Sequence, residues 1–136
     1  MKTLVIYYSY SGHTKALAEK IATDESADIV EIRDVKRMGK LKAYSVGCFA
    51  AIKGKAWPIE PVEADFAAYD RLVLFSPIWA GNTPPAFNAV LALLPEGKTV
   101  SVKLVSDSGK SGCQERLEAA IREKGCIPEG FENIRA

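Results

Sequence analysis

Three hydroxyl side chains and a glycine stand close together near the start of the chain, in the segment Ser9-Tyr10-Ser11-Gly12-His13-Thr14. The segment follows an apolar run and precedes a helical pattern, so we expect it to be a strand-to-helix turn. Such a turn offers hydroxyl donors, room for close backbone approach at the glycine, and the free amide groups of a helix start. One serine here would be typical of a helix cap, but three hydroxyls exceed what a cap needs. The segment therefore predicts a phosphate site.

A second loop follows the apolar run Leu72 to Phe75 and reads Ser76-Pro77-Ile78-Trp79-Ala80-Gly81-Asn82-Thr83-Pro84-Pro85. Its tryptophan has two interpretations. The indole either packs under the loop as part of the core or offers a flat surface on which a planar ligand stacks. A neighbouring phosphate site favours the stacking interpretation.

A third loop, Ser106-Asp107-Ser108-Gly109-Lys110-Ser111-Gly112, follows the next strand pattern and adds further amides and hydroxyls. In an open parallel sheet, the loops that leave the carboxyl ends of adjacent strands converge at one crevice. The three loops are therefore expected to form one composite site.

Two of these loops resemble motifs of the flavodoxin-like FMN-binding family. The segment Ser9 to Thr14 is similar to the flavodoxin phosphate loop, in which Ser and Thr alternate around a glycine. The pattern Pro77-x-Trp79-x-Gly81-x-x-Pro84-Pro85 is similar to the flavin loop of short flavodoxins. The resemblance covers nearly the whole chain, with both motifs in order and each after the expected strand. It implies bound flavin mononucleotide (FMN).

The resemblance also implies a role for each loop. The first loop would hold the phosphate through hydroxyls and amides, with His13 as a backbone donor. Trp79 would stack on the isoalloxazine as the one aromatic platform, and the amides of the same loop would face the ring edge. The third loop has no aromatic residue, which would leave one flavin face open, and Lys110 is either a solvated side chain or a charge beside the ring. The implied flavin-binding residues are Ser9, Tyr10, Ser11, Gly12, His13, Thr14, Pro77, Ile78, Trp79, Ala80, Gly81, Asn82, Ser106, Asp107, Ser108, Gly109 and Lys110.

Three functions are compatible with these residues. The first is an FMN-binding electron carrier that serves a redox partner protein. The second is a small FMN-dependent NAD(P)H or quinone reductase, which the open flavin face favours because hydride transfer needs direct access to the ring. The third is a degenerate flavodoxin fold that binds a protein without flavin, and the intact first two loops argue against it. No residue is assigned a catalytic role.

Composition limits the class of protein. At 136 residues with 48% hydrophobic residues, the chain is expected to form a single domain over residues 1–136 with one sizeable core. A net charge of +1 argues against nucleic acid as the main partner. The three cysteines are too few for a disulfide framework and form no metal motif, so we expect a reduced, cytoplasmic protein without a metal site. Cys113, near a helix start, is expected to be a core residue. The first apolar run, Leu4 to Tyr8, is too short for a signal peptide or a membrane span.

One stretch of the chain is strongly basic and is opposed only by Asp34. Such runs are usually solvated, but this one could also dock an acidic protein or the phosphates of NADPH. Its members are Arg33, Lys36, Arg37, Lys40, Lys42, Lys53 and Lys55.

Strand and helix patterns alternate along the chain, which predicts a parallel sheet with helices on both faces and right-handed crossovers. The expected strands are Leu4–Tyr8, Asp28–Arg33 at an edge, Leu72–Phe75 and about Thr99–Val105. The expected helices begin at Thr14, span Leu41–Ile52 and Thr83–Leu94, and follow a capping box at Ser111 and Gln114, with a stop at Gly125.

The fold class is therefore α/β, a flavodoxin-like doubly wound parallel sheet in the order 2-1-3-4 with room for a short fifth strand. Members of the family continue past a fifth strand into a last helix, and we expect this helix to be absent because only five residues follow Phe131. The fourth strand alternates apolar residues with Thr99, Ser101 and Lys103, so one of its faces is expected to be wet. The face left by the missing helix would either be polar or be covered by a second subunit, and a homodimer is the expectation if it is apolar.

Overall fold

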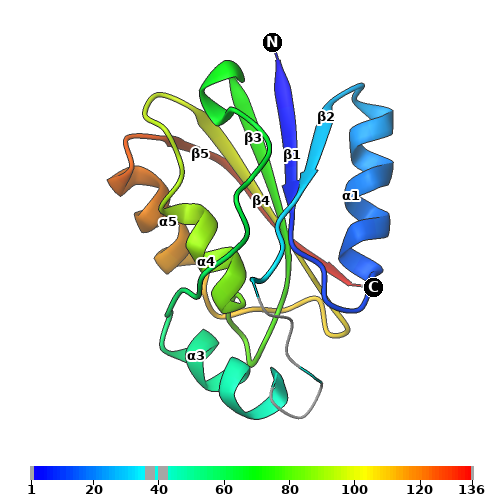
Figure 1. Cartoon of the computed structure of the whole chain (residues 1–136), viewed down its shortest axis with the longest axis vertical. Coiled ribbons are helices and arrows are strands. Elements are labelled where there is room, and N and C mark those ends of the chain that lie inside the picture. Colours follow the sequence, from blue (N-terminus) through cyan, green and yellow to red (C-terminus); the bar gives the residue numbers. More distant parts are fainter. Residues whose placement is uncertain (1, 36–38, 40–42, 136) are drawn as a thin grey trace.

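A five-stranded parallel sheet organises the molecule (Figure 1). The computed structural model describes residues 2–35, 39 and 43–135. The strand order is β2-β1-β3-β4-β5, which confirms the predicted order 2-1-3-4 and adds a fifth strand of nine residues. The strands are β1 (Thr3–Tyr7), β2 (Asp28–Glu31), β3 (Arg71–Pro77), β4 (Thr99–Ser106) and β5 (Ile127–Arg135).

The two continuous apolar runs of the sequence form the central strands β1 and β3 of the sheet. In β1 the residues Leu4, Val5 and Ile6 are buried, and in β3 the whole run Leu72 to Phe75 is buried. Covered on both faces, these strands need apolar side chains at every position, whereas β2 at the edge alternates and stays half exposed. Position in the sheet therefore follows directly from the two kinds of pattern.

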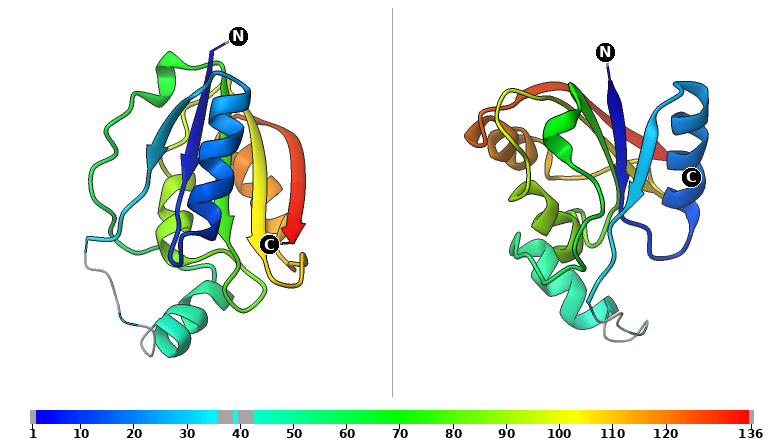
Figure 2. Two further views of the ribbon diagram at one scale, coloured as in Figure 1. Left: turned by 90° about the vertical axis from the view of Figure 1, so that its right-hand side faces the viewer. Right: turned by 45° about the horizontal axis from the view of Figure 1, so that its top comes forward.

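Helices lie on both faces of the sheet (Figure 2). On one face α1 packs against β1, β2 and β3, and on the other α4 and α5 enclose the larger core cluster. Among the described residues, no helix combines the length and the apolar character needed to cross a membrane. The helical segments are α1 (His13–Asp24), the π-helical turn η1 (Ala43–Gly47), α3 (Cys48–Ile52), the 3₁₀ turn η2 (Phe66–Ala68), α4 (Pro85–Leu91) and α5 (Gln114–Glu123).

Three helix boundaries differ from the predicted ones. The helix expected through Leu94 ends at Leu91, although Leu94 remains buried in the core. The helix expected from Leu41 begins, within the described residues, as the turn η1, and Leu41 itself lies outside them. The capping box at α5 is absent because the helix begins at Gln114 with Cys113 at its N-cap, two residues after Ser111, whose hydroxyl donates to Asn133 Oδ1. The stop at Gly125, with φ of 79°, is confirmed.

The face of the sheet that carries α1 becomes polar beyond that helix. One cross-strand row runs Tyr7, Phe75, Lys103 and Glu132. Tyr7 and Phe75 belong to the cluster packed on α1, whereas Lys103 Nζ lies 2.9 Å from Glu132 Oε1. The left view of Figure 2 shows α1 in front of the first strands while β4 and β5 lie beside it, uncovered by α1.

Arg71 extends this polar surface. Its guanidinium contacts both Glu25 and Glu129 at 2.9 Å, and Ser101 donates to the same Glu129 carboxylate. The face predicted to be wet is polar but only partly open to water, because Ser101 is 6% exposed and the Lys103 side chain 22% exposed. This part of the sheet is therefore polar, and its described residues lack the apolar face that would favour a homodimer.

We expect that an apolar replacement of one ion pair will make this face associate. Replacing Lys103 and Glu132 together by Leu would extend the apolar surface of Phe75 and Val105 across β4 and β5, and burial of such a surface is worth roughly 25 cal/mol per Å². The variant should self-associate in sedimentation velocity and bind a hydrophobic dye. The matched control replaces both residues by Gln and should behave like the unmodified chain. The prediction would be contradicted if the unmodified chain were already a dimer and the Gln variant dissociated it. The face would then promote association and not prevent it.

Candidate functional site

The three loops predicted to carry function meet at the carboxyl edge of the sheet, the lower end in Figure 1. The rings of Tyr10, in the first loop, and Trp79, in the second, lie 5.6 Å apart and nearly perpendicular. The Gly112 amide, in the third loop, donates to the Gly81 carbonyl at 2.8 Å. Parallel strands put these loops at one edge, and these two contacts join them into one surface.

The first loop ends in a helix start that no side chain caps. Gly12 precedes α1 with φ of 102°, a left-handed conformation that favours glycine, and its amide donates to Ser9 Oγ at 3.0 Å. The first backbone bond of the helix runs from Ala16 to the Gly12 carbonyl, so the amides of the first turn have no partner within the helix. Ser11 does not serve as the cap, which leaves its exposed hydroxyl available for a ligand.

The other side chains of this loop differ in exposure. Thr14 is buried against the sheet side of α1, Tyr10 is half buried, and His13 is exposed. An exposed imidazole at the first helical position agrees with the expected role of His13 as a backbone donor. The partial positive charge of the helix is concentrated at its start, beside the exposed Ser11 and Gly12.

The second loop is a tight turn held by its own backbone. Trp79 and Asn82 exchange two hydrogen bonds, of 2.8 and 3.1 Å. The two residues between them, Ala80 and Gly81, have φ of 52° and 80°, as a type I′ turn requires. A left-handed alanine costs of the order of 1 kcal/mol, which the bonded turn must offset. The turn holds the backbone of residues 80–82 in one conformation at the edge of the site.

The Trp79 ring packs on the core, as one of the two interpretations of the sequence expected. It is partly buried and packs against the larger core cluster, and its neighbours Tyr8 and Tyr10 meet it edge to face. Ile78 also packs against that cluster, and Pro77 ends β3. A second aromatic ring, that of Tyr10 in the first loop, lies beside Trp79. Stacking on a ligand stays a prediction.

In the third loop, hydroxyl groups shape the backbone. Ser106 Oγ accepts from the Gly109 amide at 3.0 Å, and Ser108 Oγ accepts from the Lys110 amide at 3.2 Å. A side chain at Gly109 would stand 3.1 Å from the Arg135 side chain, so the loop lies close against the end of β5. Asp107, Ser108 and Lys110 are exposed. The loop therefore offers amides and charged side chains more readily than free hydroxyls.

A buried polar network under the second loop escaped the sequence analysis. Arg116 Nη2 donates to Thr83 Oγ1 at 2.9 Å, and Thr83 in turn donates to Asn88 Oδ1. Asn88 Nδ2 donates to the Lys55 carbonyl at 2.8 Å. An asparagine within the apolar helix α4 is the one signal in the sequence that could have indicated this network. The network ties α4, α5 and the segment after α3 to the end of the second loop.

Arg116 is incompletely satisfied in this network. Its Nε is buried and has no hydrogen-bond partner among the described residues. Burial raises the pKa of the Cys113 thiol. A hydrogen bond with Ser111 and the positive charge of Arg116 lower this pKa, but by less than burial raises it. Cys113 is 1% exposed, which confirms its role as a core residue. No cluster of three or more metal-binding side chains occurs in the described part of the chain.

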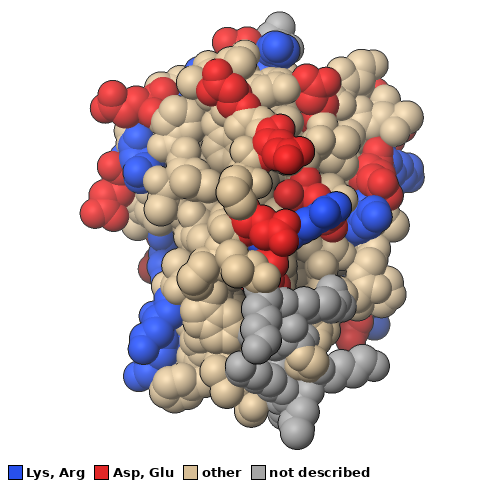
Figure 3. Space-filling model, in the orientation of Figure 1, with Lys and Arg blue, Asp and Glu red and all other residues tan. Residues whose placement is uncertain are grey.

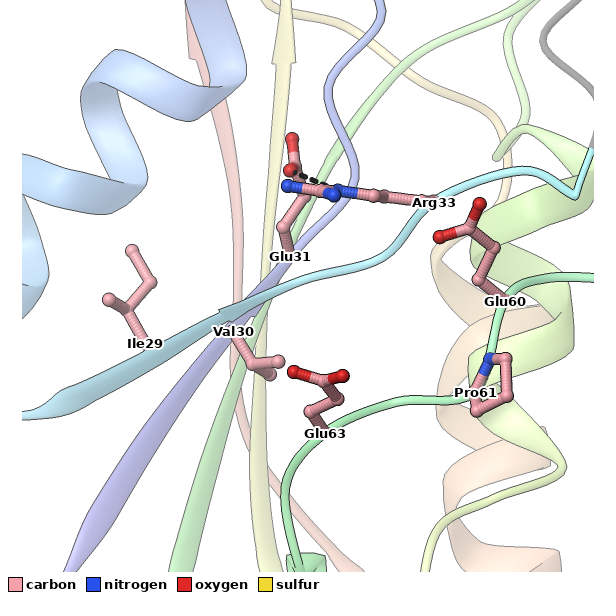
Figure 4. Close-up of a pocket in the computed structure, with 7 residues that line it drawn as sticks. All are labelled: Ile29, Val30, Glu31, Arg33, Glu60, Pro61 and Glu63. Carbon is pink, nitrogen blue, oxygen red and sulfur yellow. Dashed lines mark hydrogen bonds and ion pairs between the residues drawn. The ribbon is translucent and has the colours of Figure 1, made fainter.

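A hollow of 330 Å³ lies between β2 and residues 60–63 (Figure 4). Three of its lining residues, Glu31, Arg33 and Glu60, also line a second hollow that reaches Ser9 of the first loop. The lining of the first hollow includes Glu31, Glu60 and Glu63 against a single Arg33, whose guanidinium lies 2.8 Å from Glu31. Three carboxylates beside one paired arginine disfavour an anionic ligand. Phosphate is therefore better placed at the start of α1 than in this hollow.

Comparisons with known proteins agree on the fold. No family model matches the sequence. A curated NAD(P)H dehydrogenase (quinone) from Cupriavidus metallidurans is 35% identical over 91 residues, which cover 66% of this chain and 45% of that relative. The chain thus spans less than half of the length of the curated relative that it matches.

Two solved structures illustrate the likeness. A flavoprotein in complex with FMN from Lactobacillus acidophilus is 23% identical with a TM-score of 0.75, covering 96% of this chain and 91% of that one. Oxidised Flavodoxin 2 from Bacillus cereus is 22% identical with a TM-score of 0.59, covering 100% and 86%. With the strand order, these likenesses show that the chain has the flavodoxin-like fold.

We expect the Thr83 hydroxyl to stabilise the second loop more than an ordinary surface hydroxyl would. Thr83→Val leaves Arg116 Nη2 and Asn88 Oδ1 without this partner, which should lower the free energy of unfolding by about 2–3 kcal/mol. The matched control is Thr23→Val, which removes one exposed hydroxyl bond to the Glu19 carbonyl and should change stability by less than about 1 kcal/mol.

Urea denaturation of Thr83→Val, Arg116→Met and the double variant measures the coupling. The double variant should lose less stability than the sum of the single variants, because Arg116→Met removes the charge that Thr83→Val leaves unpaired. Additive losses would contradict the network.

Proposed function

We propose that the chain binds FMN across its three loops and acts as a redox protein, in the first place as an electron carrier. The observation that carries the proposal is the uncapped start of α1 behind the left-handed Gly12, with the Ser11 hydroxyl exposed beside it. This arrangement can receive a phosphate dianion without a cation. The FMN found in the Lactobacillus acidophilus flavoprotein supports the choice of ligand.

The residues present fit the parts of FMN one by one. The amides of the first turn of α1 and the hydroxyls of Ser11 and Thr14 would hold the phosphate. The Trp79 ring, which Tyr8 and Tyr10 contact edge to face, would orient the isoalloxazine ring of FMN. The backbone of the turn over residues 80–82 would face the edge of the isoalloxazine. When bound, FMN supplies one- and two-electron redox chemistry.

The third loop would limit the other side of the ligand. Its Ser106–Gly109 and Ser108–Lys110 bonds hold the amides in place, and the exposed Lys110 would add positive charge near the ring. No aromatic side chain occurs between Ser106 and Gly112. One face of the ring would thus remain accessible to a reaction partner.

We expect the first loop to discriminate FMN from riboflavin. Hydrogen bonds to a charged group contribute about 1.5–3 kcal/mol each, so Ser11→Ala with Thr14→Ala should weaken FMN at least about 100-fold. Riboflavin has no phosphate and should change little. Fluorescence titration of the apoprotein with both ligands measures the difference.

The control for this titration is Ser108→Ala with Ser111→Ala. It removes two hydroxyls whose hydrogen bonds lie within the third loop or reach β5, and it should affect both ligands alike. Equal loss of FMN and riboflavin in the Ser11 and Thr14 variant would show that the phosphate binds elsewhere. A purified chain that takes up neither ligand would favour a fold that binds a protein partner without flavin.

A second candidate function is reduction of a quinone or similar acceptor with NAD(P)H. It is favoured by the name of the Cupriavidus metallidurans relative and by the lack of an aromatic cover in the third loop. Since that relative is more than twice as long as the matched region, residues outside the match can supply its NAD(P)H site.

Anaerobic mixing separates the carrier from the reductase. For a carrier, the absorption bands of the FMN-loaded chain should persist when NADH or NADPH is added and bleach only with dithionite or a second protein. Bleaching by NAD(P)H alone at about 1 s⁻¹ or faster, the range of ordinary turnover, would establish the reductase instead.

A further inference from the structure

An apolar surface stands out beside the second loop. Val46, Phe49 and Ile52 are 48%, 59% and 56% exposed, on consecutive turns of η1 and α3. Ala50 and Ala51 are buried, so the segment packs on the molecule through its opposite side. Single exposed hydrophobic residues are ordinary, but three on neighbouring turns form a patch, and such patches mark interaction sites.

The same segment concentrates the positive charge of the chain. Residues 36–55 hold six Lys and Arg and no Asp or Glu, whereas the other 116 residues hold twelve Lys and Arg against seventeen Asp and Glu, a net charge of −5. Lys53 and Lys55 are exposed at the end of α3, and Lys53 Nζ lies 5.6 Å from the centre of the Phe49 ring. The remaining cations, Lys36, Arg37, Lys40 and Lys42, lie outside the described residues.

Two backbone contacts fix this segment next to the candidate flavin site. The Lys55 carbonyl accepts from Asn88, and the Trp57 amide donates to the Pro85 carbonyl at 3.2 Å. Both partners lie just after the turn that presents Trp79. Figure 1 shows α3 at the same end of the molecule as the loops.

We infer that Val46, Phe49, Ile52, Lys53 and Lys55, the α3 surface, dock an acidic redox protein that exchanges electrons with the bound flavin. The inference rests on the proposed function. A small apolar centre with a charged margin suits a transient complex, because such interfaces bury less than about 1,200 Å² and depend on charge for their rate of formation. We expect an acidic partner because residues 36–55 hold six of the eighteen Lys and Arg of the chain and no Asp or Glu.

Two other occupants fit less well. A second copy would have to bring an acidic surface such as the hollow lined by Glu31, Glu60 and Glu63. This hollow lies at β2, so the contact would join two different surfaces of the two copies, which is rarer than a symmetric contact of one surface with itself. An anionic membrane needs a helix with a broad apolar face, and here the ten residues of η1 and α3 expose only three large apolar side chains among those described.

The test uses two haem proteins of opposite charge as probes. The FMN-loaded chain is reduced with dithionite, freed of excess reductant, and mixed anaerobically with cytochrome b5, which is acidic, or cytochrome c, which is basic. Each fully reduced flavin passes one electron to each of two ferric haems, which become ferrous, and its protons go to water. The rate with cytochrome b5 should be high at low ionic strength and fall steeply with added salt, whereas the rate with cytochrome c should not fall.

Variants locate the interaction. Phe49→Asp, and separately Lys53→Glu with Lys55→Glu, should slow reduction of cytochrome b5 at least about tenfold at low salt, within the range of electrostatic steering, and leave FMN absorption unchanged. The apolar control is Ile127→Asp, at a residue 63% exposed at the start of β5. The charge control is Lys20→Glu with Arg122→Glu, two exposed positions on α1 and α5. Both controls should keep most of the rate.

Several outcomes would overturn the inference. Equal losses in the α3 variants and the controls would mean that only net charge matters. Concentration-dependent sedimentation that Phe49→Asp abolishes would assign the surface to a second copy. Loss of co-sedimentation with phosphatidylserine vesicles in the same variants would assign it to a membrane. If the loaded chain shows no flavin absorption, the proposed function itself is contradicted. The absorption spectrum reveals this before any partner is added.

Discussion

The parallel direction of β1, β3 and β4 is the constraint on which the candidate site depends. Because all three strands end at the same edge, the loops that follow them must share one space, whatever their sequences. Burial of β1 and β3 on both faces makes this edge rigid, and the Gly112–Gly81 bond and the Tyr10–Trp79 contact then set the spacing of the loops. Glycine at positions 12 and 81 permits the left-handed backbone that such close turns need.

The sheet also shows how an uncovered surface is stabilised. Where α1 covers the sheet, the cross-strand rows are apolar. Where it does not, Arg71, Ser101 and Lys103 are joined to carboxylates of β5 and to Glu25, which follows α1. Half-exposed ion pairs of this kind contribute little individually, about 0–1 kcal/mol. Their effect is to keep a wide sheet face compatible with water, where apolar side chains would promote association.

Most of the fold was predictable from the sequence because it depends on hydrophobic periodicity, which is a local property. Continuous apolar runs identified β1 and β3, and the alternation at Thr99, Ser101 and Lys103 identified a polar face before the ion pairs were known. The capping box at Ser111 failed because the helix begins only at Gln114, with Cys113 at its N-cap. The Arg116–Thr83 bond and the Tyr10–Trp79 contact join residues far apart in the sequence, and no pattern encodes such pairs.

A net charge near zero conceals two surfaces of opposite sign. In Figure 3 acidic side chains are spread over the upper and middle part of the face in view, and basic side chains gather at its lower left, where Figure 1 shows α3. The hollow at β2 gathers Glu31, Glu60 and Glu63, while Lys53 and Lys55 stand at the end of α3, so the molecule has a charge separation even though its total is +1. Such a distribution orients an approaching partner at short range without drawing every charged molecule to the protein, because the net charge is small and salt screens each surface beyond roughly one Debye length, about 8 Å at physiological salt. The basic surface lies beside the second loop, so an acidic partner that follows this field would arrive next to Trp79 and not at the polar face of β4 and β5.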